Sequence, residues 1–368
     1  MKYFIIAGER SGDMHAARLI SELKQNDPEA KIYAWGGNLM QSAGAKLLQH
    51  YNEISFMGFW EVLMNLNVIN HKLNLCKAQI KEHQPDVLIL VDFPGFNLRM
   101  AEYAKSISLK TTYYISPKIW AWKIGRIKKI RKFVDQMLVI LPFETDFYNS
   151  LNYPVKYVGN PLVESIEEYQ YNFSGLEDIK KDPKNKVAVL PGSRLQEVNK
   201  AISVINEMAS DRPDLLFLVA GVDNLPSEIY AAVDSKDNVI IEYNKTYELL
   251  KMANVAVVTS GTATLEAAII GVRQVVVYKT SWLTYSIARL LVNIKFISLV
   301  NLIAGKKVVE ELIQSDYKAK TVLKHVDGLL NNPDEISLME SGYEEIRQKL
   351  GKEKAAKNAA SEIMNFLK

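Results

Sequence analysis

Apolar and polar positions form blocks that predict strands alternating with helices along the first half of the chain. Short apolar runs rich in β-branched residues are typical of buried parallel strands, and the longer stretches between them carry apolar residues at helical spacing. The predicted helices include Asp13–Gln25 and the long stretch Met57–Glu82. The predicted strands are Lys2–Ala7, Lys31–Trp35, Asp86–Val91, Lys110–Ile115 and Gln136–Ile140. This order indicates a parallel, doubly wound α/β sheet, which binds ligands at the carboxyl ends of its strands.

The same pattern starts again after a polar stretch at Glu164–Lys186, which we interpret as a linker. A polar amphipathic helix is predicted for the last residues, about 341–368. Further strands are predicted at Val187–Leu190, Leu215–Ala220, Val239–Ile241, Val255–Val258 and Gln274–Tyr278. We therefore expect two Rossmann-like domains, residues 1–163 and 164–340, facing across a cleft in the architecture called GT-B. The last helix either packs back on the first domain or exchanges with a partner subunit.

Composition narrows the class of protein. The chain of 368 residues is long enough for two domains, and its 48% hydrophobic and 24% charged residues are ordinary for a globular protein. The net charge of +3 gives no overall signal for nucleic-acid binding. The single cysteine, Cys76, excludes an internal disulfide, and the five histidines lack the spacing of metal ligands. No stretch is long enough to span a bilayer, so we expect a cytoplasmic protein, soluble or peripheral to a membrane, without metal or cofactor.

A strand, a turn of small residues and a helix follow one another between residues 255 and 270, and this order predicts a phosphate site. Unpaired backbone N–H groups at the positive end of a helix dipole attract phosphate. The turn consists of Ser260, Gly261, Thr262 and Ala263. Glu266 lies about one turn into the helix, where its carboxylate could reach the hydroxyls of a sugar bonded to that phosphate. The same residues also fit an ordinary strand-to-helix turn capped by Ser260 or Thr262.

A second turn of small residues, Pro191-Gly192-Ser193-Arg194, follows the predicted strand Val187–Leu190. Its small residues, Ser193 among them, let a ligand approach the backbone closely. The guanidinium of Arg194 suits a diphosphate because it is always charged and presents forked donors. A surface arginine at the start of a helix is the alternative. With the turn at residue 260, this turn predicts a site for a nucleotide-sugar diphosphate.

Carboxylates at two strand ends of the first domain are the candidates for a general base. Asp92 follows directly on a predicted strand, and Glu9 and Asp13 belong to the loop after the first strand. A base that removes the proton of an acceptor hydroxyl must lie at such a ligand-binding edge. Tight turns with helix capping are the alternative, and the residues alone do not decide which carboxylate is the base. The residues expected to line the acceptor side of the cleft are Ser11, Gly12, Ser116 and Asn97.

Two stretches of the first domain have the composition of an interfacial surface. Residues 120–132 contain two tryptophans and six cations, with isoleucines at helical spacing, and residues 56–64 are apolar and aromatic. Such segments are typical of a surface that lies on anionic lipid. The residues predicted for it are Met57, Phe59, Trp60, Trp120, Trp122, Lys123, Arg126, Lys128, Lys129 and Arg131. A solvated basic helix and a core helix are the alternatives, and the adjacent apolar patch argues against nucleic acid.

These motifs, in this order, resemble the lipid-A-disaccharide synthase family, the inverting GT-B glycosyltransferases of bacterial outer-membrane lipid A assembly. The most specific of them is the run Ser116-Pro117-Lys118-Ile119-Trp120-Ala121-Trp122. The others are Ala7–Asp13, Met57–Val62, Val91–Asn97, Leu190–Arg194, Ser260–Glu266 and Asn301–Gly305. Together they cover nearly the whole chain.

The resemblance implies UDP-2,3-diacylglucosamine as donor and 2,3-diacylglucosamine 1-phosphate (lipid X) as acceptor, with the β(1→6) disaccharide 1-phosphate and UDP as products. It implies inversion, with a carboxylate base and with Arg194 and the helix end at Thr262 stabilising the leaving diphosphate without a metal. Asn301 is expected at the UDP-sugar site. The acyl chains explain the interfacial surface, which implies a peripheral protein on the cytoplasmic face of a Gram-negative inner membrane. The C-terminal region offers a homodimer contact.

The chain departs from the family pattern at several positions. Gly95 stands where many members have a second aspartate, which makes Asp92 the stronger base candidate, and Asn160 stands where histidine is common. Two rival hypotheses are a GT-B transferase or epimerase acting on a soluble UDP-N-acetylglucosamine-type sugar, and a non-catalytic, membrane-associated nucleotide-sugar-binding protein. The first rival has no need for the apolar and basic surfaces.

Overall fold

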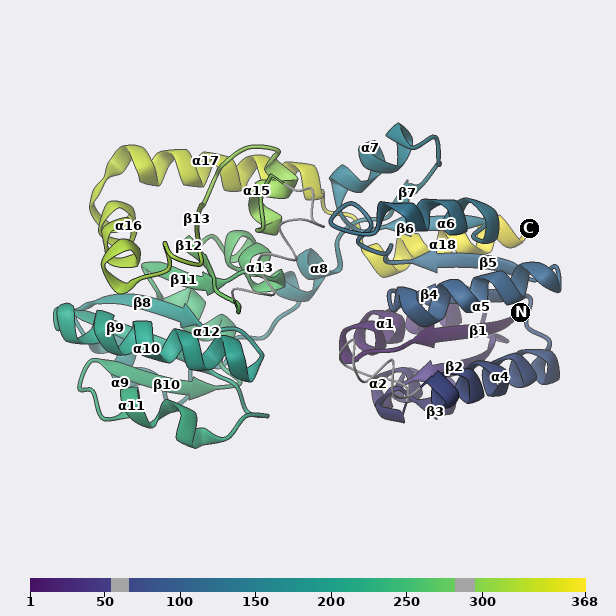
Figure 1. Cartoon of the computed structure of the whole chain (residues 1–368), viewed down its shortest axis with the longest axis horizontal. Coiled ribbons are helices and arrows are strands. Elements are labelled where there is room, and N and C mark those ends of the chain that lie inside the picture. Colours follow the sequence, from purple (N-terminus) through teal and green to yellow (C-terminus); the bar gives the residue numbers. More distant parts are fainter. Residues whose placement is uncertain (54–65, 282–294) are drawn as a thin grey trace. The chain divides into compact units, whose positions relative to one another are not determined.

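The structure is a computed structural model that describes residues 1–53, 66–281 and 295–368. Its internal contacts divide the chain into two compact units (Figure 1). Unit 1 comprises Met1–Glu164 and Leu350–Lys368, and unit 2 comprises Ser165–Lys349. The chain therefore enters unit 2 within helix α8 (Pro161–Glu167) and leaves it at the end of helix α17 (Pro333–Leu350).

Unit 1 is built on a seven-stranded sheet in which all neighbouring strands are parallel. The strands are β1 (Lys2–Ala7), β2 (Lys31–Gly36), β3 (Lys46–His50), β4 (Val87–Val91), β5 (Lys110–Tyr114), β6 (Gln136–Val139) and β7 (Lys156–Tyr157). Their order is β3-β2-β1-β4-β5-β6-β7. Every residue of β4 is buried, because helices cover both faces of the sheet.

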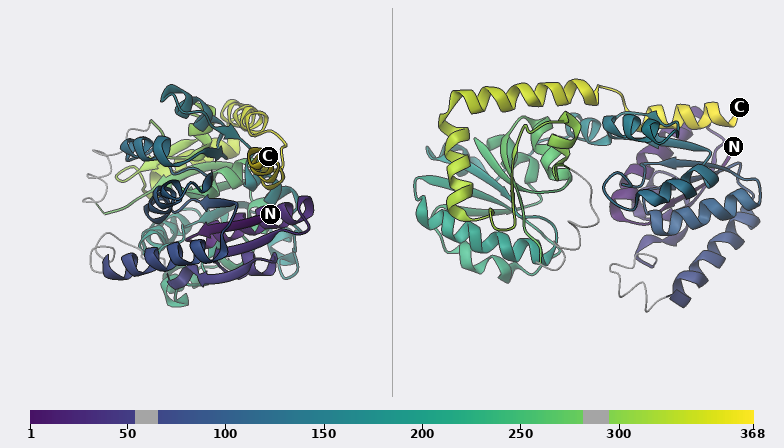
Figure 2. Two further views of the ribbon diagram at one scale, coloured as in Figure 1. Left: turned by 90° about the vertical axis from the view of Figure 1, so that its right-hand side faces the viewer. Right: turned by 45° about the horizontal axis from the view of Figure 1, so that its top comes forward.

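The helices of unit 1 form two layers. They are α1 (Arg10–Asn26), α2 (Asn38–Ser42), α4 (Leu66–His83), α5 (Pro94–Ser106), α6 (Ile127–Phe133), α7 (Pro142–Ser150) and α18 (Ala355–Leu367), with 3-10 turns at Tyr51–Glu53 and Ile124–Arg126. Phe4 and Leu88 pack with α4 and α5 on one face, and Tyr3 and Val87 pack with α1 and α18 on the other. Figure 2 shows the terminal helix α18, in yellow, against unit 1. Alternate residues of β1 and β4 therefore fill opposite cores.

Unit 2 repeats this design with a six-stranded parallel sheet in the order β10-β9-β8-β11-β12-β13. The strands are β8 (Asn185–Leu190), β9 (Leu215–Gly221), β10 (Val239–Tyr243), β11 (Val255–Thr259), β12 (Arg273–Tyr278) and β13 (Glu310–Ile313). The helices are α9 (Glu177–Lys181), α10 (Leu195–Asp211), α11 (Ala231–Asp234), α12 (Thr246–Met252), α13 (Thr262–Ile270), α15 (Leu299–Ala304), α16 (Ala319–Asn331) and α17, with a 3-10 turn at Ser227–Tyr230. Two parallel, doubly wound α/β sheets are the fold class that the sequence predicted.

Several elements differ from their predictions. The edge strands β3, β7 and β13 were not predicted, because they are short and carry polar residues. The helix predicted at 341–368 is two helices, because Gly351 adopts a left-handed φ of 69° just after α17 and ends it. Part of the predicted helix Met57–Glu82 lies outside the described residues, and its described part begins at Leu66.

Two segments near the points where the chain passes from one unit to the other pack into the hydrophobic cores. The stretch predicted as a linker contains α9, and Leu176 and Ile179 are buried in the core of unit 2. The last helix, α18, packs on unit 1 of its own chain through Ala359 and Ile363. Buried apolar contacts therefore order both segments.

Candidate active site

The strand order of each sheet reverses at one place, where the loops of neighbouring strands diverge and leave room for a ligand. This switch point lies between β1 and β4 in unit 1 and between β8 and β11 in unit 2. The loops that follow these four strands carry Glu9, Asp92, Arg194 and Ser260. Sheet topology thus selects the same four turns as the sequence motifs, one pair in each unit.

Asp92 is held in a strained backbone at the end of β4. Asp92 and Phe93 have φ values of 44° and 46°, in the left-handed region that non-glycine residues seldom adopt. The backbone carbonyl of Asp92 accepts hydrogen bonds from the Tyr113 hydroxyl and, at 2.8 Å, from Nδ2 of Asn97. Such strain costs about 1–3 kcal/mol per residue and clusters at functional sites. These bonds keep Asp92 at the switch point.

The loop after β1 lies close to the Asp92 loop. Ala7 pairs in register with Val91, and a Cβ at Gly8 would lie 2.2 Å from the Phe93 ring, so only glycine fits there. Glu9 is the N-cap of α1 and is exposed. Two of the three predicted base candidates, Glu9 and Asp92, therefore lie on adjoining loops.

The electrostatic surroundings of Asp92 suit a general base. Burial raises the pKa of Asp92, the Lys118 ammonium lowers it, and the Glu9 carboxylate raises it. A carboxylate whose pKa is raised toward the operating pH is a more effective proton acceptor. Lys118 belongs to the Ser116–Trp122 run and was not predicted as a site residue. Its position, two residues after the predicted ligand residue Ser116, was the available signal.

A buried carboxylate fixes the loop that carries Lys118. Oε1 of the buried Glu144 accepts hydrogen bonds from the Ser116 hydroxyl at 2.6 Å and from Nε1 of Trp120 at 3.0 Å. Its Oε2 accepts a hydrogen bond from the Leu141 N–H at 3.1 Å. Burial raises the pKa of Glu144, and these hydrogen bonds oppose that change. No local sequence pattern points to Glu144, because its side-chain partners are 28 and 24 residues away.

Asp13, the third predicted base candidate, caps a neighbouring helix in the structure. Its carboxylate is buried and accepts hydrogen bonds from the N–H groups of Gly37 (2.8 Å), Leu39 (3.2 Å) and Met40 (3.1 Å). These bonds satisfy the N–H groups at the start of α2, which the helix itself leaves unpaired. Three backbone donors therefore occupy this carboxylate.

Three of the four residues predicted to line the acceptor side, Gly12, Asn97 and Ser116, are buried. Asn97 uses its Nδ2 to support the end of β4, and Ser116 donates to Glu144. A Cβ at Gly12 would lie 3.2 Å from the Cβ of Ala7, so this glycine allows α1 to pack closely on β1. Ser11 alone of the four is exposed.

Unit 2 has a pocket of about 440 Å³ at its switch point, formed by the loops after β8, β9, β10 and β11. Seven of the eight residues predicted for the UDP sugar line it, namely Ser193, Arg194, Ser260, Gly261, Thr262, Ala263 and Glu266. Asp223, Asn244 and Thr246 also line the pocket and were not singled out in the sequence. They lie on loops without a recognisable motif, and the fold alone brings them there.

The turn after β8 leaves the Arg194 guanidinium available in this pocket. Gly192 has a φ of 101°, and a Cβ there would lie 2.6 Å from Oε2 of Glu197. The same oxygen accepts hydrogen bonds from the N–H groups of Ser193 (3.2 Å) and Arg194 (3.3 Å). The guanidinium lies 3.5 Å from Oε1 of Glu197, but the Arg194 side chain is 79% exposed. An exposed ion pair of this kind is weak, so the guanidinium can turn to a bound anion.

The start of α13 has no side-chain cap. Its N-cap residue is Gly261, and the Ser260 hydroxyl donates to the Ile297 carbonyl at 3.0 Å instead of capping the helix. Capping by Ser260 or Thr262, the alternative drawn from the sequence, is therefore wrong. The first N–H groups of an uncapped helix are available to an anion. Burial raises the pKa of Glu266 one turn further on.

Asn301 is a structural residue of unit 2, and it does not line the pocket. It is fully buried, and its Oδ1 accepts hydrogen bonds from the N–H groups of Val308 (2.7 Å) and Val309 (3.0 Å). Its Nδ2 donates to the Val309 carbonyl and to Oε1 of Glu311. Glu311 also accepts from the N–H of Ile297, whose carbonyl holds Ser260. Through Glu311 and Ile297, Asn301 supports the Ser260 turn, and its contact with the UDP sugar stays a prediction.

We expect Asn301→Ala to lower the free energy of unfolding by about 2–4 kcal/mol, because each buried N–H left unpaired costs about 1–3 kcal/mol. Urea unfolding followed by circular dichroism measures this loss. Asn331→Ala is the matched control, because Asn331 is a helical asparagine whose exposed side chain donates to Asp327. A stable Asn301→Ala protein that fails to bind UDP would instead make Asn301 a ligand residue.

The described part of the predicted lipid surface presents both aromatic residues and cations. Trp122 and Ile124 are 42% and 54% exposed. The Lys123 ammonium and the Arg126 guanidinium lie 4.2 and 5.3 Å from the centre of the Trp122 ring. Lys128, Lys129 and Arg131 are also exposed. Within the described residues, no helix is both long enough and apolar enough to span a bilayer.

Other residues predicted for this surface differ from expectation. Trp120 is only partly exposed, and its indole N–H is bonded to Glu144, so it belongs to the support of the loop. The isoleucines at helical spacing, Ile127 and Ile130, face the core of unit 1. Met57, Phe59 and Trp60 lie outside the described residues.

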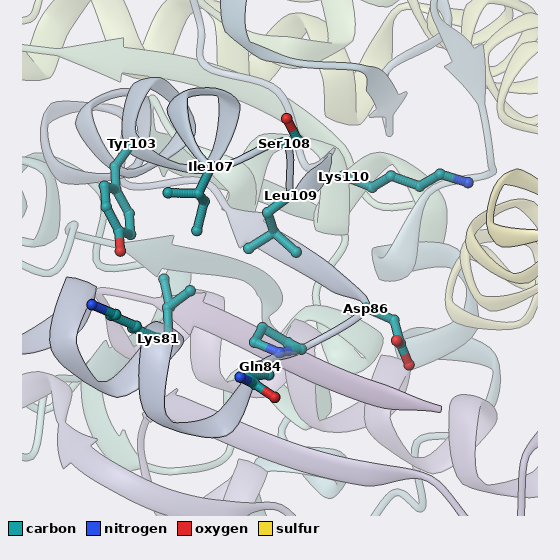
Figure 3. A pocket seen from close by; sticks show the side chains of 10 residues that line it. Lys81, Gln84, Asp86, Tyr103, Ile107, Ser108, Leu109 and Lys110 are labelled. Carbon is teal, nitrogen blue, oxygen red and sulfur yellow. The ribbon is translucent and has the colours of Figure 1, made fainter.

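A larger pocket, of about 630 Å³, lies at the opposite edge of the unit 1 sheet, before β4 and β5 (Figure 3). Its lining includes Asp86 and Lys110, which are occupied elsewhere: Asp86 accepts from the Lys2 N–H, and Lys110 donates to the Phe366 carbonyl. Doubly wound sheets bind their ligands at the carboxyl ends of the strands. We therefore do not assign this pocket to the reaction.

Comparison with known proteins gives one family over the whole chain. The model of the family described as lipid-A-disaccharide synthetase matches residues 3–364. A lipid-A-disaccharide synthase of Geobacter sulfurreducens is 34% identical over 373 residues, which cover 100% of this chain and 97% of the relative. That of Myxococcus xanthus is 35% identical over 374 residues, with the same coverage of 100% and 97%.

Solved structures share the fold at much lower identity. The UDP-GlcNAc 2-epimerase from Neisseria meningitidis bound to UDP-GlcNAc has a TM-score of 0.64 at 14% identity, over 100% of this chain and 99% of that one. CalG4, the calicheamicin glycosyltransferase, has a TM-score of 0.64 at 15% identity, over 99% of this chain and 98% of that one. At such identities the similarity shows the fold alone.

Proposed function

The chain belongs to the lipid-A-disaccharide synthase family of GT-B glycosyltransferases in lipid A biosynthesis, and from this premise we propose which of its residues carry out the transfer. The donor is UDP-2,3-diacylglucosamine, and its UDP group occupies the pocket of unit 2. The acceptor is 2,3-diacylglucosamine 1-phosphate, and its 6-hydroxyl lies at the switch point of unit 1 beside Asp92.

Asp92 is the general base of this proposal. Its carboxylate removes the proton of the acceptor 6-hydroxyl as that oxygen bonds to the anomeric carbon of the donor, while the bond from this carbon to the diphosphate breaks. Attack from the face opposite the leaving group inverts the anomeric carbon. The backbone strain at Asp92 and its raised pKa support this role.

The pocket of unit 2 stabilises the leaving UDP. Arg194 and the free N–H groups at the start of α13 meet the negative charge that develops on the diphosphate, and Glu266 accepts hydrogen bonds from the ribose hydroxyls. The observation that carries this proposal is the gathering of seven predicted residues in one pocket at the switch point.

Formation of the disaccharide from the two acylated sugars in detergent micelles tests the substrates. We expect release of UDP and a tetraacyl disaccharide 1-phosphate, with no isomerisation of UDP-N-acetylglucosamine. Isomerisation of the soluble sugar without disaccharide formation would establish the epimerase hypothesis instead. Binding of the UDP sugar with no turnover of either substrate would support a non-catalytic protein.

The pH profile identifies the base. Because Lys118 lowers the pKa of Asp92, Lys118→Met should move the acid limb of kcat/KM to higher pH. Because the Glu9 carboxylate raises the pKa of Asp92, Glu9→Gln should move the acid limb of kcat/KM to lower pH. Steady-state rates from pH 4 to 9 measure both shifts. Loss of the acid limb in Glu9→Gln, with little activity at any pH, would make Glu9 the base.

The exposed surface around Trp122 contacts the cytoplasmic face of the inner membrane in this proposal. Lys123 and Arg126 would meet lipid phosphates, and Trp122 and Ile124 would enter the headgroup region. This contact brings the acylated substrates to unit 1. The homodimer through the C-terminal region stays a prediction, which the mass of the protein in solution tests.

Replacing Lys123 and Arg126 with glutamate should weaken binding to vesicles rich in phosphatidylglycerol at least about 30-fold, because each cation near an anionic surface contributes about 1 kcal/mol and each new carboxylate is repelled by it. Cosedimentation with vesicles measures the effect. Lys320→Glu with Lys324→Glu makes the same change of charge on the exposed side of α16 in unit 2 and should have little effect. Equal losses for both pairs would show a general charge effect without a local surface.

A further inference from the structure

Lys118 is an exposed cation on a loop that is held on both sides of it. The side chains of Ser116 and Trp120 each donate a hydrogen bond to the buried Glu144 carboxylate, at 2.6 and 3.0 Å. Ile119, between Lys118 and Trp120, is buried in the core of unit 1. Lys118 itself is exposed. The backbone of Lys118 is therefore positioned before any ligand binds, while its side chain faces solvent.

This loop begins beside the turn that carries Asp92. The N–H of Asp92 donates to the Tyr114 carbonyl at 3.3 Å, and the Tyr113 hydroxyl donates to the Asp92 carbonyl. The next residue, Ile115, has a left-handed φ of 65°, which is rare for a β-branched side chain and turns the chain at the end of β5. Lys118 follows three residues later. Asp92 and Lys118 therefore belong to the loops of two hydrogen-bonded neighbouring strands, at the same edge of the sheet.

The edge that carries Asp92 has charges of both signs. The Lys118 ammonium lowers the pKa of Asp92 and the Glu9 carboxylate raises it, in agreement with their places on adjoining loops. Yet Lys118 forms no ion pair and no side-chain hydrogen bond with any residue that the structure describes. An ammonium that lies near a carboxylate without pairing with it is available to an anion that a ligand brings.

We propose that Lys118 binds the 1-phosphate of the acceptor and so makes the enzyme select a phosphorylated sugar. This inference rests on the proposed function, which places the acceptor 6-hydroxyl at Asp92. The phosphate is bonded to C1 of the same sugar ring, so the group that holds it must lie within the length of one sugar from the base. A phosphate monoester carries nearly two negative charges at neutral pH. At an edge with the carboxylates of Glu9 and Asp92 it needs a cation, and lysine binds phosphate as a point charge.

Transfer to two acceptors in neutral detergent micelles tests the proposal, each variant being measured at its own pH optimum. The acceptors are 2,3-diacylglucosamine 1-phosphate and its 1-O-methyl counterpart, which lacks the phosphate. Lys118→Met should lower the ratio of kcat/KM for the phosphorylated over the methyl acceptor about 10–100-fold, as expected for a hydrogen bond between charged groups. Lys118→Arg should keep most of the preference, because arginine retains the charge. Lys81→Met is the matched control, since Lys81 is an exposed lysine at the opposite edge of the sheet (Figure 3), and it should keep the wild-type ratio.

The phosphate of a membrane lipid is the other source of this chemistry, because Trp122 and Lys123 of the proposed lipid surface follow on the same loop. Lys118→Met should bind phosphatidylglycerol vesicles as the wild type does. Weaker vesicle binding with an unchanged ratio would assign the ammonium to lipid headgroups and overturn the inference. Equal losses for both acceptors would also overturn it and leave Lys118 with its effect on Asp92 alone. If the wild type transfers to neither acceptor, the proposed function fails, and this inference fails with it.

Discussion

Asp92→Asn should lower kcat/KM for disaccharide formation about 10²- to 10⁴-fold, the usual contribution of a general base. Asparagine is close to aspartate in shape and tolerates the left-handed conformation that residue 92 adopts, so the turn after β4 should persist. The amide cannot accept the proton of the acceptor hydroxyl. UDP affinity should be unchanged, because the pocket assigned to UDP lies in unit 2. Initial rates and calorimetric titration measure the two quantities.

Asp86→Asn is the matched control for this experiment. Asp86 immediately precedes the same strand, at its amino end, and is exposed at the pocket of Figure 3. The same substitution at this end of β4 should leave kcat/KM near the wild-type value. If Asp92→Asn turns over normally, the base is Glu9, because the Asp13 carboxylate is occupied by three N–H groups of α2.

The sequence predicted the fold class well because its central strands are buried on both faces. In a chain of alternating strands and helices, the continuous apolar runs at Val87–Val91 and Val255–Thr259 predict fully buried parallel strands. Edge strands such as Glu310–Ile313 carry no such run, since one side faces solvent. Their pairing depends on contacts that no local pattern records.

The same contrast applies to the site. Arg194 and Glu266 could be predicted, because a turn of small residues between a strand and a helix has a local physical meaning. Asp13 and Asn301 occur in motifs that are just as distinct, yet both side chains hydrogen-bond backbone N–H groups of the protein. Asp13 bonds Gly37, 24 residues along the chain, and Asn301 bonds Val308, seven residues along. A motif shows that a residue type is needed at a position. It does not separate contact with a ligand from support of the loop that makes the contact, and Glu144 has no local signal at all.

Arg194→Ala should lower kcat/KM about 10²- to 10³-fold, a loss of about 2.7–4 kcal/mol of transition-state stabilisation. The guanidinium is available for this role because its side chain is 79% exposed and its ion pair with Glu197 is 3.5 Å long. The charge on the diphosphate increases as UDP leaves, so kcat should fall more than UDP affinity. Arg194→Lys should be intermediate, because lysine keeps the charge but cannot present two parallel donors.

Arg347→Ala is the matched control, since Arg347 is also a unit 2 arginine in an exposed i,i+3 ion pair, with Glu344 at 3.0 Å, and lies outside the pocket lining. It should leave the rate unchanged. Glu197 provides the decisive second comparison. Its carboxylate holds the N–H groups of Ser193 and Arg194, so Glu197→Gln should keep the turn while freeing the guanidinium, and UDP affinity should be maintained or increased. A normal rate for Arg194→Ala, with UDP still bound, would leave the start of α13 as the group that stabilises the departing diphosphate.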